Sequence, residues 1–92
     1  AKKKEEPKDG IASYRNKNYS EAVRILEEVL KVNPDSVNAL YYNGLSHFEL
    51  KNYDKAIQNL AKVKTGSALY EDAQQALAKA YIAKGDKMKA KE

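Results

Sequence analysis

The chain resembles itself at a spacing of 34 residues, and this period constrains its fold more than any other feature. A shift of 34 residues places Gly10 on Gly44 and Ala22 on Ala56. The same shift also aligns Lys17-Asn18-Tyr19 with Lys51-Asn52-Tyr53, Leu26 with Leu60, and Val29 with Val63. A second shift gives a weaker third copy, in which Ala39 falls on Ala73. Because a fixed period of 20–50 residues is the signature of stacked repeat units, we expect a repeat architecture.

Each unit has the pattern of two antiparallel helices. The segment Ser20–Val32 carries apolar residues at helical spacing. Asn33-Pro34-Asp35 should end this helix, because proline cannot continue it. Asp35 or Ser36 can then cap a helix that runs to about Lys51. Since the chain has only 4 Gly and 2 Pro, helices dominate the prediction.

The second half of the chain repeats this layout. Lys51-Asn52-Tyr53-Asp54 reads as a polar turn, with Asp54 as the cap of a helix over 55–63. Gly66 replaces the proline as the signal that ends this helix. A fifth helix is expected over about 70–84, closed by Gly85, and a sixth begins near Lys87.

Small residues recur where the two helices of a hairpin should touch. Gly10 and Gly44, with Ala78 in the third copy, fall on the first helix of each unit. Ala22 and Ala56, with Ala90 in the third copy, fall on the second helix. Because packed helices lie only about 8–10 Å apart, a large side chain here would separate them. We therefore expect close contacts at these positions.

The combined pattern resembles the tetratricopeptide repeat. The matching residues are Gly10, Tyr19, Ala22, Leu26, Val29 and Pro34, then Leu40, Gly44, Tyr53, Ala56, Leu60 and Val63, then Leu77, Ala78, Tyr81, Gly85, Asp86 and Ala90. The resemblance implies an all-α fold of antiparallel helix hairpins, stacked as a right-handed superhelix of about two and a half repeats. Residues 1–8 would be a charged linker and 9–92 the repeat domain. The repeats would cover about 3–36, 37–70 and, as a partial third copy, 71–92.

The resemblance also implies a function. In this family the first helix of each pair lines a concave groove that binds a peptide or protein segment, so the chain would be a protein-interaction scaffold. Carried over by alignment, the groove residues are Ile11, Tyr14, Arg15, Asn38, Tyr41, Tyr42, Leu45, Phe48, Glu49, Gln75, Lys79 and Ile82, and Asp72 also falls on this surface. Tyrosine suits such contacts because it offers a large ring and a polar end.

One ligand class of the family does not fit. Family members that bind the acidic C-terminal tails of heat-shock chaperones use lysine, arginine and asparagine as a clamp for two carboxylates. The corresponding positions here hold Pro7, Ile11, Tyr42, Asp72 and Ala76. Because none matches, and Asp72 would repel a carboxylate, we expect a more apolar or aromatic partner.

Other function classes find little support in the sequence. The net charge of +4 is spread along the chain, so we expect no nucleic-acid binding. Cysteine is absent and His47 is the one histidine, so we expect no metal site and interpret His47 as a ring packed between helices. No arrangement of catalytic residues or phosphate-binding loop is present, so we expect neither catalysis nor a cofactor.

Two matters stay open at this point. The third copy stops about six residues into its second helix, so we interpret the chain as a piece of a longer array. Self-association through this incomplete copy is the alternative function, because repeat arrays need covered ends. Lys2-Lys3-Lys4 could flank a membrane anchor, as in similar bacterial repeat segments, which favours a bacterial source. The compartment is therefore either the cytoplasm or the soluble side of an anchored protein.

Overall fold

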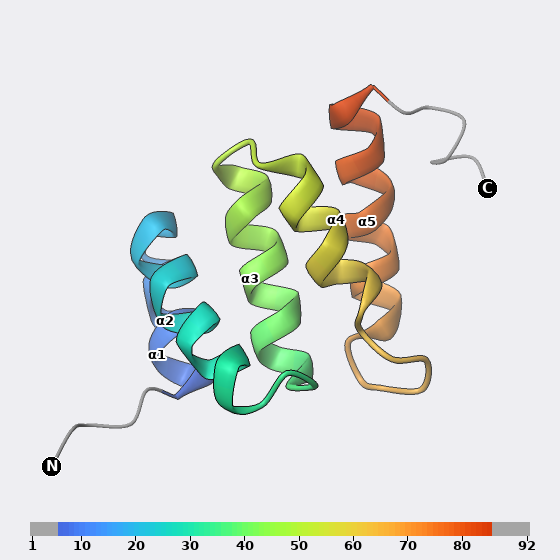
Figure 1. Cartoon of the computed structure of the whole chain (residues 1–92). Helices are drawn as coiled ribbons and strands as arrows, with labels where there is room; N and C mark the ends of the chain where they lie inside the picture. Colours follow the sequence, from blue (N-terminus) through green and yellow to red (C-terminus); the bar gives the residue numbers. More distant parts are fainter. Residues whose placement is uncertain (1–5, 86–92) are drawn as a thin grey trace, which may run out of the picture.

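The computed structural model describes residues 6–85, and these form α-helices joined by short turns (Figure 1). The helices are α1 (Pro7–Arg15), α2 (Tyr19–Val32), α3 (Val37–Glu49), α4 (Tyr53–Ala61) and α5 (Tyr70–Lys84). The part of the chain that is described contains no strand. The predicted all-α class of helix-hairpin repeats is confirmed.

The helices are arranged in two layers. Each helix packs against the next one in the chain, and α3 also contacts both α1 and α5. Figure 1 shows α2 in front of α1 and α4 in front of α5. The first helices of the repeats, α1, α3 and α5, therefore form one contacting layer, and α2 and α4 cover it from the other side.

Two glycines permit the close approach of the helices within a hairpin. A Cβ atom on Gly44 of α3 would lie 2.6 Å from Cγ of Leu60 on α4. A Cβ atom on Gly10 of α1 would collide in the same way with Leu26 on α2. Both leucines are fully buried. The 34-residue period thus repeats one packing contact, a leucine against a glycine, and the predicted close approach at the two glycines is confirmed.

The turn between the helices of each hairpin uses the left-handed backbone region. Lys17 has φ of 63° and Lys51 has φ of 65°. Gly85 follows α5 at the same repeat position, with φ of 96°. Only glycine adopts this region without a steric cost. The backbone is therefore strained at Lys17 and Lys51 but not at Gly85.

This strain leads to a prediction about stability. Lys51→Gly is expected to raise the free energy of unfolding by about 1 kcal/mol, because it removes the left-handed cost of a side chain. Lys55→Gly within α4 is the matched control and should lower it by about 1 kcal/mol, since glycine disfavours a helix interior. Urea unfolding followed by circular dichroism measures both. A loss of stability in Lys51→Gly would contradict the assignment of strain.

Several helix ends differ from the prediction. Helix α1 begins at Pro7, so Pro7 and Lys8 of the expected linker are helical, and proline suits the first turn of a helix. Ser36 does cap α3, accepting a hydrogen bond of 3.2 Å from the backbone nitrogen of Ala39. The predicted Asp54 cap is wrong, because α4 begins at Tyr53, two residues before the expected residue 55, and Asn52 stands at the cap position.

Side chains at both ends of α4 pack against the rest of the hairpin. The Tyr53 ring lies 5.5 Å from the Phe48 ring, and Tyr53 is the first residue of the helix. The helix ends at Ala61, before the expected residue 63 and before Gly66. A tight turn then seats Val63, 3% exposed, in the core. The predicted sixth helix near Lys87 lies outside the described residues.

Candidate functional site

A hollow of about 280 Å³ opens on the layer formed by α1, α3 and α5. Helix α3 supplies Tyr41, Leu45, Phe48 and Glu49, spaced so that they share one helix face. Tyr14 borders the hollow from α1. Helix α5 supplies the opposite wall with Asp72, Gln75, Ala76 and Lys79. The first helices of three successive repeats thus contribute to one surface.

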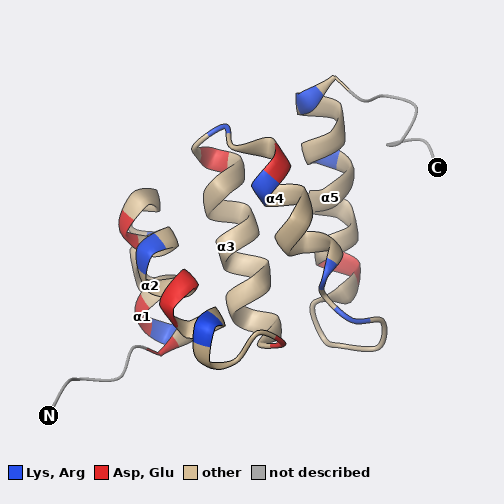
Figure 2. Ribbon diagram, viewed as in Figure 1, with Lys and Arg blue, Asp and Glu red and all other residues tan. Residues whose placement is uncertain are grey.

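The floor of the hollow is apolar and aromatic. Tyr41 and Phe48 of α3 both pack partly against the buried cluster around Leu40 and Leu60, so their rings are held in place from beneath. Figure 2 shows α3 without a charged residue until its C-terminal end, where Glu49 lies. The uncharged helix therefore forms the base, and the charges lie at the edges.

The edges of the hollow carry opposite charges in unequal number. Glu49 and Asp72 are exposed carboxylates, and Lys79 is an exposed amine. Burial raises the pKa of the Tyr14 hydroxyl, and the nearby charge of Glu49 raises it further. Burial also raises the pKa of Tyr41, with Asp72 as the next cause. Each tyrosine of the hollow therefore lies in the field of one carboxylate.

The rings beside the hollow form a continuous chain of contacts. Tyr14 lies 5.6 Å from Tyr42 between ring centroids, and Tyr42 lies 5.1 Å from Tyr41. Tyr19 extends the chain at 5.7 Å from Tyr14. Aromatic pairs at these separations add about 0.5–1.5 kcal/mol each beyond burial. The contacts connect α1 to α3 and fix the ring positions before any ligand binds.

The structure gathers part of the predicted groove and separates the rest. The predicted residues that line the hollow are Tyr14, Tyr41, Leu45, Phe48, Glu49, Asp72, Gln75 and Lys79. Tyr42 packs instead against the buried cluster around Leu26. Ile82 is 55% exposed and lies beyond the hollow. Ile11 is half-buried on α1, while Arg15 and Asn38 are exposed at helix ends, and none of the three lines the hollow.

Ala76 also lines the hollow; the sequence placed it at a position of the chaperone-tail clamp but not among the predicted groove residues. It lies four residues after Asp72 and three before Lys79, so the three share one face of α5. This helical spacing was the signal that could have identified it. Because its side chain is small, Ala76 leaves room between the two walls.

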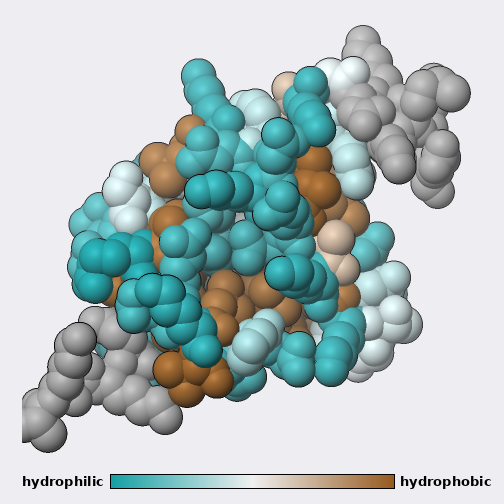
Figure 3. Space-filling model, in the orientation of Figure 1, coloured by the Kyte–Doolittle hydropathy of each residue, from teal (hydrophilic) through white to brown (hydrophobic). Residues whose placement is uncertain are grey.

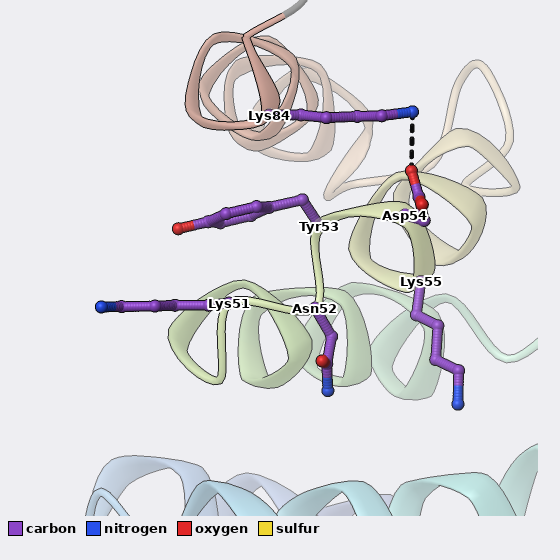
Figure 4. Close-up of a pocket in the computed structure, with 6 residues that line it drawn as sticks. All are labelled: Lys51, Asn52, Tyr53, Asp54, Lys55 and Lys84. Carbon is purple, nitrogen blue, oxygen red and sulfur yellow. Dashed lines mark ion pairs between the residues drawn. The ribbon is translucent and has the colours of Figure 1, made fainter.

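A second hollow, between the turn after α3 and the end of α5, is less suited to a ligand. Figure 4 shows that Lys51 and Tyr53 point to one side, whereas Asn52 and Lys55 point elsewhere. The Lys84 amine and the Asp54 carboxylate pair with each other at 2.7 Å. These side chains do not converge on a common point.

A third hollow lies on the opposite layer, between α2 and α4, and covers a buried polar cluster of α3. His47 is 2% exposed, and its Nε2 lies 3.1 Å from a carboxylate oxygen of Glu27. Asn43 is 1% exposed and reaches Asn59 at 3.5 Å. The histidine is thus packed between helices, as predicted. Figure 3 shows a mostly hydrophilic surface over α2 and α4, with hydrophobic atoms in small patches between.

Residues 6–85 offer neither a metal cluster nor a membrane-spanning helix. In this range no three side chains of histidine, aspartate or glutamate gather closely enough to hold a metal ion. None of the helices α1 to α5 has the length and hydropathy needed to cross a membrane.

Comparison with known proteins agrees with the architecture. A family model described as the tetratricopeptide repeat matches residues 9–68, which is more than half of the chain. The Hsp70-Hsp90 organising protein of Plasmodium falciparum (isolate 3D7) is 37% identical over 49 residues, which are 53% of this chain and 9% of that protein. Proteins of this family generally mediate protein–protein interaction. The period, the helix pairs and the family model agree, and the chain belongs to the tetratricopeptide repeat family.

Proposed function

We propose that the chain is a protein-interaction scaffold that binds a peptide or protein segment in the hollow between α1, α3 and α5. The observation that carries this proposal is the aromatic and apolar floor of Tyr41, Leu45 and Phe48, bordered by polar side chains of α1 and α5. A concave apolar surface with a few polar groups at its rim is the usual form of a binding site.

The tyrosines suit this role for a physical reason. Tyr14 and Tyr41 are half-buried, so each has one side packed and one side available. A ring held in this way loses little conformational entropy when a ligand binds. The hollow can therefore accept a side chain without ordering its own floor.

The lining of the hollow does not favour catalysis, acidic peptides or nucleic acid. We assign it no catalytic step and no cofactor, because its charged groups stand at the edges of an apolar floor. Asp72 in its wall disfavours the acidic tails of chaperones. Lys and Arg are interspersed with Asp and Glu along the helices (Figure 2), which disfavours nucleic acid.

A pair of glutamines allows a matched test. Gln75 lines the hollow on α5, and Gln58 is exposed on α4 at the opposite layer. Peptides selected from a random display library on the full chain are titrated against Gln75→Trp and Gln58→Trp. The indole at position 75 should block the hollow and weaken binding by about tenfold or more, since a single well-placed contact exceeds 1 kcal/mol. Gln58→Trp should bind as the unchanged chain does.

If Gln58→Trp weakened peptide binding and Gln75→Trp did not, the assignment of binding to the groove would be contradicted. Light scattering of each sample accompanies the titrations, because self-association through the third repeat is the alternative role and exposed Ile82 offers it an apolar contact. A mass that rises with concentration and falls on peptide addition would favour that alternative.

A further inference from the structure

We infer that the segment bound in the hollow carries an arginine next to a large apolar side chain. This inference rests on the proposed function and specifies the chemistry of its partner. It follows from the unequal charges at the edges of the hollow, from the tyrosine rings close to the two carboxylates, and from the apolar floor.

The charge of the hollow is opposite to that of the whole chain. Glu49 and Asp72 contribute two negative charges and Lys79 one positive charge, so the lining carries a formal charge of −1. The complete chain carries +4. Neither carboxylate forms an ion pair with another residue in the 6–85 range. Two carboxylates at the edge of an aromatic surface are therefore available to pair with a cation of the ligand.

The tyrosines favour arginine over lysine. The Tyr14 and Tyr41 rings each lie in the field of a carboxylate, Glu49 for the first and Asp72 for the second. Each ring offers an aromatic face that attracts a cation, and the carboxylate close to it adds a second attraction. A guanidinium can stack on such a ring and bind a carboxylate through two nitrogens, which an ammonium cannot do.

The apolar half of the motif has its own contact surface. Leu45 and Phe48 are half-buried on the floor, and Ala76 is half-buried in the wall of α5. A leucine or aromatic side chain beside the arginine would cover these groups and displace water from the edges, which strengthens the charge interaction. Lys79 is the one lining cation, so an acidic segment would meet two like charges for one opposite charge.

The first arm of the test is the composition of selected peptides. A random peptide library is selected on the full chain, and peptides that also bind Gln75→Trp are discarded. We expect the remaining peptides to be enriched in arginine directly beside an aromatic or branched aliphatic residue. Enrichment in aspartate or glutamate, in lysine without arginine, or in no charged residue would overturn the inference.

The second arm uses charge-neutral variants with a matched control. Asp72→Asn and Glu49→Gln should each weaken the best selected peptide by about threefold, the range of exposed charge pairs. Glu71→Gln is the control, because Glu71 is exposed in the same first turn of α5 but does not line the hollow. It should leave the affinity unchanged. Replacing the peptide's arginine with citrulline, its neutral isostere, should give a loss of about fivefold.

The outcomes separate this inference from the proposed function. One outcome is an affinity that is insensitive to Asp72→Asn, Glu49→Gln and citrulline while Gln75→Trp still blocks binding. That result would support the proposed groove and contradict the inferred arginine. If Glu71→Gln weakens binding as much as Asp72→Asn, the effect is long-range and the inference also fails. If no peptide depends on position 75, the proposed function itself is wrong.

Discussion

Leu60→Ala is expected to lower the free energy of unfolding by about 3 kcal/mol, the typical cost of a cavity at a buried leucine. Leu60 is 0% exposed and belongs to the buried cluster that joins α3, α4 and α5. A chain of this size has a free energy of unfolding of only about 5–10 kcal/mol. The loss would therefore be a large part of the total, visible in urea unfolding followed by circular dichroism.

Leu50→Ala is the matched control for this prediction. Leu50 follows α3 and is 36% exposed, so its truncation removes less buried surface. We expect a loss of about 0.5 kcal/mol, as for surface substitutions. Equal losses at positions 50 and 60 would show that the cluster around Leu60 is not the main core of the second hairpin.

Gly44→Ala is expected to destabilise the protein by about 2 kcal/mol, although alanine is the better helix former by about 1 kcal/mol. The added methyl group would lie 2.6 Å from Cγ of Leu60 and 3.4 Å from the backbone oxygen of Ala56. The helices would have to separate, because the leucine is enclosed on all sides. The sign of the effect thus reports the close approach of α3 and α4.

A double variant tests whether the glycine and the leucine act together. In Gly44→Ala with Leu60→Ala, the new methyl group enters the space that the leucine vacates. The double variant should be more stable than the sum of the two losses by about 1 kcal/mol or more, the coupling seen between residues in contact. Additive losses would contradict the direct contact, and a stabilising Gly44→Ala would contradict the close packing itself.

The sequence predicted the helix pairs because their contacts repeat. Gly44 recurs at the position of Gly10, and Leu60 at that of Leu26, so one steric requirement appears twice. Helix α5 runs over the residues expected from its flanking glycine. The start of α4 was not predictable from cap propensity, because Asn52 and Asp54 are both favoured N-cap residues and the helix begins after Asn52.

The candidate site was predicted less completely than the fold. Alignment to a repeat identifies which helix faces inward, and this was sufficient to place Tyr41 and Gln75 in the hollow. It does not show how neighbouring rings pack, and Tyr42 turns away to join Tyr14 and the core. Ile82 stands at the repeat position of Phe48 but lies outside the hollow, which needs helices on both sides.

Amide-shift mapping by nuclear magnetic resonance locates the bound peptide on the helices of the full chain. The isotope-labelled full chain is titrated with a selected peptide, and each backbone amide is followed. We expect the largest shifts on the facing turns of α1, α3 and α5, around Tyr14, Tyr41, Leu45 and Gln75. Shifts concentrated on α2 and α4, around Glu27 and Gln58, would contradict binding in the hollow.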